Sequence, residues 1–374
     1  MIYKEFQGKK LSALGMGCMR FPIKDGKFTD IDEEKTAEMF DYAIKNGINY
    51  FDTAYMYHGG QSEIVMGKLL KKYPRDSYYI ADKFPGVDLK AFGRVEEIFE
   101  EQLKKVGVEY FDFYLLHCVC ENNIEKYLDE QYGTVEYLLE QKRKGRIGHL
   151  GFSAHAEVAT MRRLLEKYGD VMEFCQLQIN WLDWTYEKAK DKVALLKEYN
   201  IPVWVMEPVR GGRLANLSAD YEARLKALRP EETMAAWAFR FLQTAVDCTM
   251  VLSGMSDFAQ VQENIKTFSE EKPLNEQELQ ALQSIVDDFM GKLTPCTGCR
   301  YCTEYCPQGL NIPMLLNLYN EYKFSFDGVQ AQRSILRVPE GKRPNDCIQC
   351  RVCEGVCPQK IRIADELAKF AGMF

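Results

Sequence analysis

Short apolar runs alternate with amphipathic, helix-like segments along most of the chain, and this alternation limits the possible folds more than any other sequence feature. After a short hairpin, strands are expected around Gly15 and Gly17 and at 48–51, 78–83, 111–116, 149–152, 174–178, 201–205 and 249–252. Eight strand–helix units, spaced by about 30 residues, are typical of an α/β protein with a (β/α)8 barrel. A doubly wound open sheet is the alternative, but the count of eight and the absence of G-x-G-x-x-G disfavour it.

The length of the chain and the point where the alternation ends predict two domains. The 374 residues exceed the roughly 250 of a typical barrel, which leaves room for one small module. A further amphipathic helix at 275–290 ends before Gly-Lys-Leu-Thr-Pro at 291–295, which is typical of a domain boundary. We therefore expect a barrel over residues 1–290 and a mainly helical domain over 291–374.

Composition excludes several classes of function. The net charge of −7 argues against binding to nucleic acid, which usually needs a basic face. No apolar run approaches the roughly 18 residues that span a membrane, and the first residues are polar, without a signal-peptide core. Thirteen cysteines without a secretory signal indicate reduced thiols that hold metal. The expected location is the cytoplasm.

Eight of the cysteines form two arrays, each of which ends in Cys-Pro. The arrays are Cys296-x-x-Cys299-x-x-Cys302-x-x-x-Cys306 and Cys347-x-x-Cys350-x-x-Cys353-x-x-x-Cys357. Three thiolates of a tight loop can bind three irons of a [4Fe-4S] cube, whereas the fourth cannot reach the same cube and binds the other cluster in two-cluster ferredoxins. We assign one cluster to Cys296, Cys299, Cys302 and Cys357, and the second to Cys347, Cys350, Cys353 and Cys306. The segment resembles a bacterial-type dicluster ferredoxin; zinc is the alternative, but its sites rarely use this pattern.

Four polar residues follow or end separate expected strands, at the face where barrels carry their active sites. They are Asp52, Tyr57, Lys83 and His117. A tyrosine titrates near pH 10 when unperturbed, and a neighbouring lysine ammonium would lower that pKa, with an aspartate holding the lysine charged. A histidine could orient a carbonyl oxygen toward the phenol. Together the four predict a general acid for carbonyl reduction.

These four residues belong to a longer set of motifs by which residues 1 to about 290 resemble the aldo-keto reductase family. The motifs are Asp-Thr-Ala-x-x-Tyr at 52–57, Ser-Glu-x-x-x-Gly at 62–67, Lys83, Leu-Leu-His at 115–117, Gly-Phe-Ser at 151–153, Gln176, Asn-Trp-Leu-Asp at 180–183, Pro208, Gly211, Gly212, Leu214 and Glu263-Asn264. The resemblance implies NAD(P)H-dependent carbonyl reduction. It makes Tyr57 the acid, tuned by Lys83 and Asp52, and it makes His117 the residue that orients the substrate.

The resemblance also implies a set of cofactor-binding positions, some of which depart from the family pattern. The set is Ser153, Gln176, Met206, Pro208, Gly211, Gly212, Arg213, Leu214, Gly254, Gln260, Glu263 and Asn264. Ala154 replaces the usual carboxamide-binding Asn, and Met206 replaces an aromatic residue that stacks on the nicotinamide. Gly254 and Gln260 stand where Lys and Arg often bind the 2′-phosphate, although Arg210 and Arg213 could compensate from the loop after the seventh strand. The expected cofactor is NADP or NAD, and a flavin has no motif here.

Three functions remain open because a cluster carries one electron at a time whereas a hydride carries two. The first is NAD(P)H-dependent carbonyl reduction with structural, regulatory or electron-transfer clusters. The second is a reductase fed through the clusters by a ferredoxin- or flavodoxin-type partner, with or without a flavin. The third is a non-enzymatic electron carrier or redox sensor, which the intact tetrad disfavours. Retention of Ser153, Gln176 and Glu263-Asn264 favours the first, with a small carbonyl compound as substrate.

The remaining cysteines and histidines of the barrel give weaker signals. Cys118 and Cys120 follow His117 into the expected mouth and are either redox-active thiols or small packing residues. His58 adjoins Tyr57 and is expected to line the pocket. The residues expected to be structural are Cys18, Cys175, Cys248, His149 and His155.

Overall fold

The chain forms two compact units, Met1–Leu279 and Gln280–Phe374. The computed structural model describes residues 1–324, 335–336 and 338–373. The division between the units falls inside helix α12 (Glu276–Met290), and the domain limit after residue 290 stays a prediction. None of the described helices combines the length and the apolar character needed to cross a bilayer.

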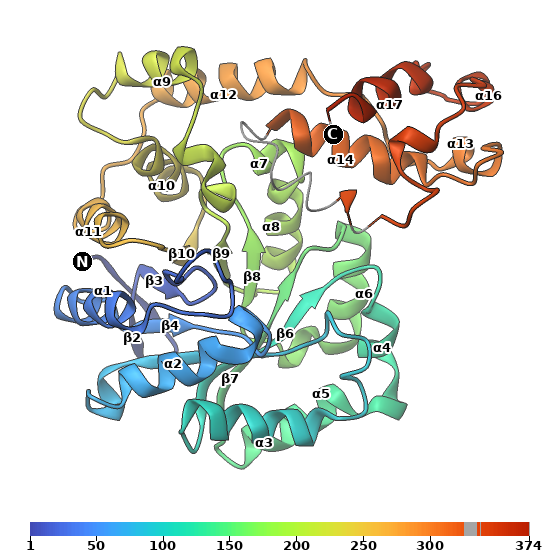
Figure 1. Cartoon of the computed structure of the whole chain (residues 1–374). Helices are drawn as coiled ribbons and strands as arrows, with labels where there is room; N and C mark the ends of the chain where they lie inside the picture. Colours follow the sequence, from blue (N-terminus) through green and yellow to red (C-terminus); the bar gives the residue numbers. More distant parts are fainter. Residues whose placement is uncertain (325–334, 337, 374) are drawn as a thin grey trace. The chain divides into compact units, whose positions relative to one another are not determined.

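Eight strands close into a barrel in the N-terminal unit (Figure 1), which confirms the predicted (β/α)8 fold. In order around the barrel they are β10 (Cys248–Gly254), β3 (Leu14–Gly17), β4 (Tyr50–Asp52), β5 (Tyr79–Phe84), β6 (Phe111–Val119), β7 (Ile147–Ala154), β8 (Cys175–Gln178) and β9 (Val203–Met206). All neighbours pair in parallel. Their carboxyl ends therefore share one face of the barrel.

Helices follow the strands along the chain, and the longer helices of the barrel turn an apolar face inward. They are α1 (Glu33–Lys45), α2 (Gln61–Leu70), α3 (Val95–Val106), α4 (Ile124–Leu128), α5 (Thr134–Arg143), α6 (Val158–Tyr168), α7 (Asp183–Tyr186), α8 (Ala189–Glu198), α9 (Ala219–Lys226), α10 (Met234–Ala245), α11 (Phe258–Thr267) and α12. In α6, for example, the buried residues Met161, Leu164, Leu165 and Tyr168 follow the three- and four-residue spacing of one helix face. Short 3₁₀ turns are η1 (Tyr57–Gly60), η2 (Arg75–Ser77), η3 (Glu130–Tyr132), η4 (Gly169–Val171) and η5 (Arg210–Ala215).

An N-terminal hairpin closes the end of the barrel that lies opposite the carboxyl ends of the strands. Strands β1 (Tyr3–Phe6) and β2 (Lys9–Ser12) pair antiparallel and bury Phe6 in the barrel core. The Phe6 ring lies 4.8 Å from that of Trp204 and 5.0 Å from that of His149, centroid to centroid. Because aromatic side chains bury large apolar areas, this plug excludes water from one end and leaves the other end for chemistry.

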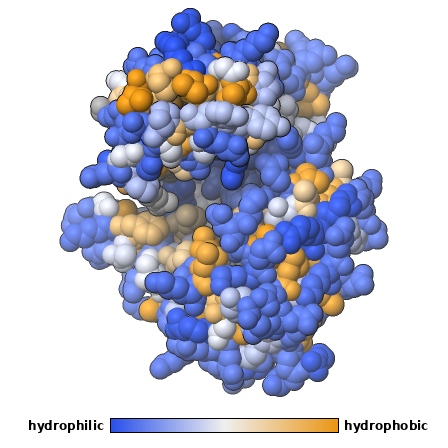
Figure 2. Space-filling model, turned by 90° about the vertical axis from the view of Figure 1, so that its right-hand side faces the viewer, coloured by the Kyte–Doolittle hydropathy of each residue, from blue (hydrophilic) through white to orange (hydrophobic). Residues whose placement is uncertain are grey.

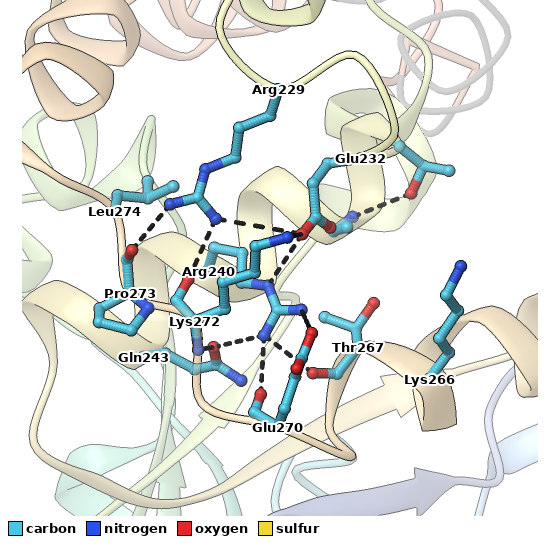
Figure 3. Close-up of polar contacts among 12 residues, drawn as sticks. Arg229, Glu232, Arg240, Gln243, Lys266, Thr267, Glu270, Lys272, Pro273 and Leu274 are labelled. Carbon is cyan, nitrogen blue, oxygen red and sulfur yellow. Dashed lines mark hydrogen bonds and ion pairs between the residues drawn. The ribbon is translucent and has the colours of Figure 1, made fainter.

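A buried polar network fixes the segment that follows α11 (Figure 3). Arg240 Nη1 donates to the carbonyl oxygens of Thr267, at 3.0 Å, and of Glu270, at 2.8 Å. Arg229 donates to both carboxylate oxygens of Glu278, at 2.6 and 2.7 Å, at the start of α12. Bidentate guanidinium–carboxylate pairs are geometrically specific, so the network holds the C-terminal end of α11 and the first turn of α12 in place.

The C-terminal unit is built from two similar halves around one apolar core. Each half has a cysteine loop, a short helix and a longer helix: α13 (Tyr301–Glu304) with α14 (Ile312–Phe324), and α16 (Val352–Gly355) with α17 (Ile363–Ala371). The turn η6 (Pro344–Asp346) precedes the second loop. The core contains Leu315, Leu316, Ile363, Leu367 and Phe370, together with the ligand candidates Cys302 and Cys353. The fold is mainly helical, as predicted.

Candidate active site and metal centres

The four polar residues predicted at the barrel mouth lie together. Asp52 ends β4, Lys83 lies in β5, His117 in β6, and Tyr57 begins η1 directly after β4. Lys83 Nζ is 2.5 Å from Asp52 Oδ1 and 5.1 Å from the centroid of the Tyr57 ring. The Tyr57 and His117 rings meet edge to face with centroids 5.9 Å apart. The phenol therefore lies between an ammonium group and an imidazole.

The lysine–aspartate pair is buried and fully engaged. Lys83 and Asp52 are 1% and 4% exposed, and Lys83 Nζ also donates to the carbonyl oxygen of Thr53 at 2.5 Å. Gln176 Nε2 donates to the second carboxylate oxygen of Asp52 at 2.7 Å. Burial would lower the pKa of Lys83, but the charge of Asp52 raises it above its usual value. The lysine consequently stays charged.

The pKa of the Tyr57 hydroxyl differs from the sequence-based expectation. Burial raises the pKa of Tyr57 to about 12, although the Lys83 charge acts in the expected direction and lowers it. The prediction of a lowered pKa is wrong in its net sign because desolvation of the phenolate outweighs the ammonium. At neutral pH the phenol therefore holds its proton, which is the state that a proton donor needs.

His117 is held neutral beside that phenol. Burial, followed by the charges of Lys83 and His155, lowers the pKa of His117 well below its usual value. Its Nδ1 atom is buried and finds no hydrogen-bond partner among the described residues. A buried polar atom without a partner is costly, and a ligand that binds at the mouth would satisfy it.

His58, which adjoins Tyr57, is enclosed by the loop that follows β3. It is buried between the rings of Phe21 and Phe28, its Nε2 accepts the Phe21 N–H at 3.2 Å, and its Nδ1 lies 2.7 Å from the Phe28 carbonyl oxygen. It therefore anchors the loop that follows β3. The expected structural role fits His149, which pairs with Glu173 at 3.0 Å in the closed end of the barrel.

The thiols that follow His117 sit in a constrained turn. Cys118 has a φ of 56°, and its N–H donates to Ser153 Oγ at 2.8 Å. Asn123 holds the turn by donating to the Cys118 carbonyl oxygen at 2.9 Å and by accepting the Cys120 N–H at 2.9 Å. Burial raises the pKa of the Cys118 thiol to about 12, so it is not a reactive thiolate.

Several predicted cofactor positions already have partners within the barrel. Besides Ser153 and Gln176, Asn264 Nδ2 donates to Ser253 Oγ at 3.1 Å, and Glu263 accepts a hydrogen bond from Thr233. Gln260 Oε1 accepts the Ser256 N–H at 2.8 Å. The other positions are placed as follows: Met206 ends β9, Pro208 follows it, Gly211, Gly212, Arg213 and Leu214 lie in η5, and Gly254 ends β10.

The loop after β9 has the open backbone expected of a phosphate loop. Gly211 and Gly212 adopt φ values of 65° and 94°, which favour glycine. The neighbouring Arg210 is buried and pairs with Asp183 at 3.0 Å, so it anchors the loop. The phosphate contact suggested for Arg210 from sequence stays a prediction.

Arg20, which sequence reasoning missed, lies between two of the predicted cofactor positions. A Cβ on Gly254 would approach Arg20 Cγ to 2.7 Å, and one on Gly211 would approach Arg20 Nη2 to 3.3 Å. The two glycines therefore form a cradle with a guanidinium in it, which fits an anionic, phosphate-bearing cofactor. Its position just after β3, at the carboxyl end of a strand, could have identified it.

The eight array cysteines surround two separate cavities in the C-terminal unit. One cavity is lined by Cys296, Cys299, Cys302 and Cys357, and the other by Cys306, Cys347, Cys350 and Cys353. These are the two sets predicted from the sequence, including the exchange of the fourth cysteine. No three Cys, His, Asp or Glu side chains in the described part of the chain converge on a single-ion site. Four thiols around a cavity are a donor set that fits a [4Fe-4S] cube.

Comparisons with known proteins cover both units. A family model described as "Aldo/keto reductase family" matches residues 13–287, and one described as "4Fe-4S dicluster domain" matches residues 295–362. A probable aldo-keto reductase of Glycine max is 32% identical over 216 residues, which is 55% of this chain and 58% of that protein. The NADH-specific methylglyoxal reductase of Escherichia coli is 25% identical over 299 residues, 68% of this chain and 89% of that protein.

Solved structures give the same result for the fold. The holo form of an aldo-keto reductase from Bacillus halodurans matches with a TM-score of 0.58 and 25% identity, over 76% of this chain and 96% of that one. An aldo/keto reductase from Klebsiella pneumoniae, solved with NADP and acetate, matches with a TM-score of 0.60 and 18% identity, over 75% and 93% of the two chains. The second similarity is evidence for the fold alone.

Proposed function

Because the chain belongs to the aldo/keto reductase family and carries a 4Fe-4S dicluster domain, we propose that it reduces the carbonyl group of a small organic substrate with NADPH or NADH. In this proposal Tyr57 is the general acid. The observation that carries the proposal is the packing of the Tyr57 phenol against the buried Lys83–Asp52 pair and the neutral His117.

The proton transfer follows from the state of each side chain. Tyr57 begins protonated and gives its proton to the oxygen that becomes the alcohol. The phenolate that remains faces the Lys83 ammonium, whose Nζ is 5.1 Å from the ring centroid. Since a buried charge is stable only when it is paired, Lys83 lowers the energy of this state more than that of the starting state. Asp52 holds the lysine in place for this purpose.

His117 orients the carbonyl group in this scheme. A neutral imidazole carries one N–H, which donates to the carbonyl oxygen and polarises it. A charged imidazolium would instead compete as the acid, and burial beside Lys83 prevents that form. General acid catalysis of this kind contributes about 10²–10⁴-fold to the rate.

The hydride donor is proposed from the fit of the residues around the mouth. When bound, NADPH or NADH supplies the hydride. Arg20 and the backbone of Gly211 and Gly212 would hold its phosphates, and Ser153 lies beside the mouth to contact the nicotinamide. The Gln176 amide is engaged by Asp52, so we assign it to supporting the catalytic pair as well as to the cofactor.

A second candidate function is electron delivery through the clusters by a ferredoxin- or flavodoxin-type partner. It is favoured by the exposure of one ligand candidate in each array, Cys299 and Cys350. Tyr301 and Ile348, in the same loops, are 59% and 58% exposed. A cluster bound by these arrays would be near the surface of the C-terminal unit and accessible to a partner. Figure 2 shows hydrophobic side chains exposed among hydrophilic ones on one face of the molecule.

An anaerobic turnover experiment separates the two candidates. The holoprotein is mixed with a panel of small aldehydes and ketones and with NADPH, NADH or reduced ferredoxin, while nicotinamide oxidation and cluster absorbance are followed. The first candidate predicts one nicotinamide oxidised per alcohol formed, without cluster bleaching. Alcohol formation with reduced ferredoxin and with neither nicotinamide would refute it in favour of the second.

A further inference from the structure

Two buried carboxyl groups lie together behind the strand that carries Lys83. They belong to Glu63, in α2, and Asp82, in β5. Among the described residues, Asp82 Oδ2 and Glu63 Oε1 have no hydrogen-bond partner, and Glu63 Oε2 has only an ion pair with Lys105. Both side chains are 0% exposed. Because side chains alternate along a strand, Asp82 points to the outer layer of helices while Lys83 points into the barrel. The two carboxyl groups are within hydrogen-bonding reach of each other.

The charges around this pair do not neutralise two carboxylates. On its outer side Lys105 Nζ, from α3, is 3.2 Å from Glu63 Oε2, but it also pairs with Glu101 at 2.9 Å. On the inner side the Lys83 ammonium pairs with Asp52. From β6, the Tyr114 hydroxyl donates to Gln102 Oε1 at 2.5 Å and not to the pair. Two ionised carboxylates would therefore share part of one ammonium in a dry site, which is strongly unfavourable.

We propose that Glu63 and Asp82 share one proton and that this acid pair positions the backbone of Lys83 for catalysis. A shared proton supplies a hydrogen-bond donor between the two carboxyl groups and leaves the pair with a single negative charge opposite Lys105. Burial, followed by the neighbouring carboxylate, raises the pKa of Asp82 well above its usual value. Burial also raises the pKa of Glu63.

The positioning role follows from contacts to the peptide groups of Lys83. Asp82 Oδ1 accepts the Lys83 N–H at 2.8 Å. Gln102 Nε2, from α3, donates to the Lys83 carbonyl oxygen at 3.0 Å. The outer layer therefore holds both the N–H and the carbonyl group of Lys83, and the Lys83 side chain extends toward Tyr57. Both residues of the pair are positioning residues, since neither touches the mouth.

Infrared spectroscopy tests the shared proton independently of the proposed reaction. The holoprotein at neutral pH is expected to show a carboxylic-acid C=O stretch that shifts in D2O and is lost in both Asp82→Asn and Glu63→Gln, because either change removes one acid and leaves the other ionised. Glu101→Gln, the matched control in α3, should retain the band. Absence of the band in the native protein, or its persistence in both variants, would overturn the proposal.

The positioning role rests on the proposed carbonyl reduction and is tested by kinetics. Asp82→Leu, which cannot accept the Lys83 N–H, is expected to lower kcat at least tenfold and to change KM less than threefold. Asp82→Asn should restore most of kcat. If the native kcat falls at high pH as the shared proton is lost, that fall should be absent in Asp82→Asn. Equal losses in both variants would contradict positioning by this contact. If the native protein turns over no carbonyl compound, the proposed function fails while the infrared result still decides the shared proton.

Discussion

The barrel mouth and the cysteine sites are built in opposite ways. At the mouth the buried charges are already matched by protein groups, with Asp52 held by Lys83 at 2.5 Å and by Gln176 at 2.7 Å. In the C-terminal unit the thiols surround cavities, and two of them, Cys302 and Cys353, belong to the apolar core itself. The charges of the barrel site are therefore paired by protein groups, whereas we expect the stability of the C-terminal unit to depend on bound clusters.

The largest expected effect is the loss of a cluster. Cys302→Ala removes a thiol that is both a ligand candidate and part of the core, so iron content should fall by about half because one of the two sites of a dicluster domain is lost. Proteolysis after residue 291 should increase while the barrel stays folded. Cys248→Ala, in β10, is the control and should keep all the iron. Full iron content in Cys302→Ala would show that our ligand sets are wrong.

The next effect is confined to the barrel. Lys83→Met leaves the buried Asp52 carboxylate unpaired and should lower the free energy of unfolding by about 3–5 kcal/mol. All four tryptophans lie in the N-terminal unit, so their fluorescence during urea unfolding reports on the barrel alone. Lys68→Met, at an exposed pair with Glu33, should cost less than about 1 kcal/mol. Equal losses in the two variants would contradict a matched, buried pair.

Acid should weaken both units to a similar extent. Burial raises the pKa of Glu173, but His149 and Lys142 outweigh it and lower that pKa to about 2. Burial likewise raises the pKa of Glu366, but Lys369 and Thr294 lower it to about 2. A depressed folded-state pKa adds stability above the unfolded pKa of about 4.3, and that stability is lost as the pH falls toward 2.

Glu173→Gln and Glu366→Gln should therefore each cost about 1–3 kcal/mol at neutral pH and flatten the acid dependence of stability. Tryptophan fluorescence follows the first variant, and cluster absorbance follows the second. The exposed Glu97→Gln is the control. If the acid dependence of stability is unchanged in either variant, the corresponding ion pair does not contribute to it.

The smallest effect concerns the pH dependence of turnover. Because burial raises the pKa of Tyr57 to about 12 and lowers that of His117 well below its usual value, neither group changes its protonation near neutrality. The kcat for reduction should vary less than about twofold between pH ~6 and ~9. An inflection of kcat in that pH range would contradict Tyr57 as the acid if it is also present in Asp82→Asn, which lacks the outer acid pair.

Features set by local spacing could be predicted from the sequence. The eight strands follow from the repeated apolar runs, and the placement of Cys306 and Cys357 at the cavity of the other array agrees with the argument from the short loops. The grouping of Asp52, Tyr57, Lys83 and His117 was predictable because each lies near or after the carboxyl end of a parallel strand.

Features that depend on pairing between distant residues could not be predicted. Gln176 is 124 positions from Asp52, and no spacing rule predicts that its amide binds that carboxylate. The net rise in the pKa of Tyr57 reflects burial, which a motif does not encode. The stacking of His58 between Phe21 and Phe28, from the loop after β3, likewise follows from no motif. The proximity of Glu63, in α2, to Asp82, in β5, follows from no spacing rule, although Glu63 belongs to a recognised motif.

Tyr57→Phe in the intact, cluster-loaded protein tests the central claim most directly. Carbonyl turnover and nicotinamide binding are measured anaerobically in the same preparation, with iron content as a check that the C-terminal unit is unchanged. The account predicts that kcat falls by about 10²–10⁴-fold while the Kd for NADPH or NADH changes less than about twofold, because only the proton donor is removed. Turnover within about threefold of the native protein would contradict it, since no transition-state interaction of the phenol would then have been lost.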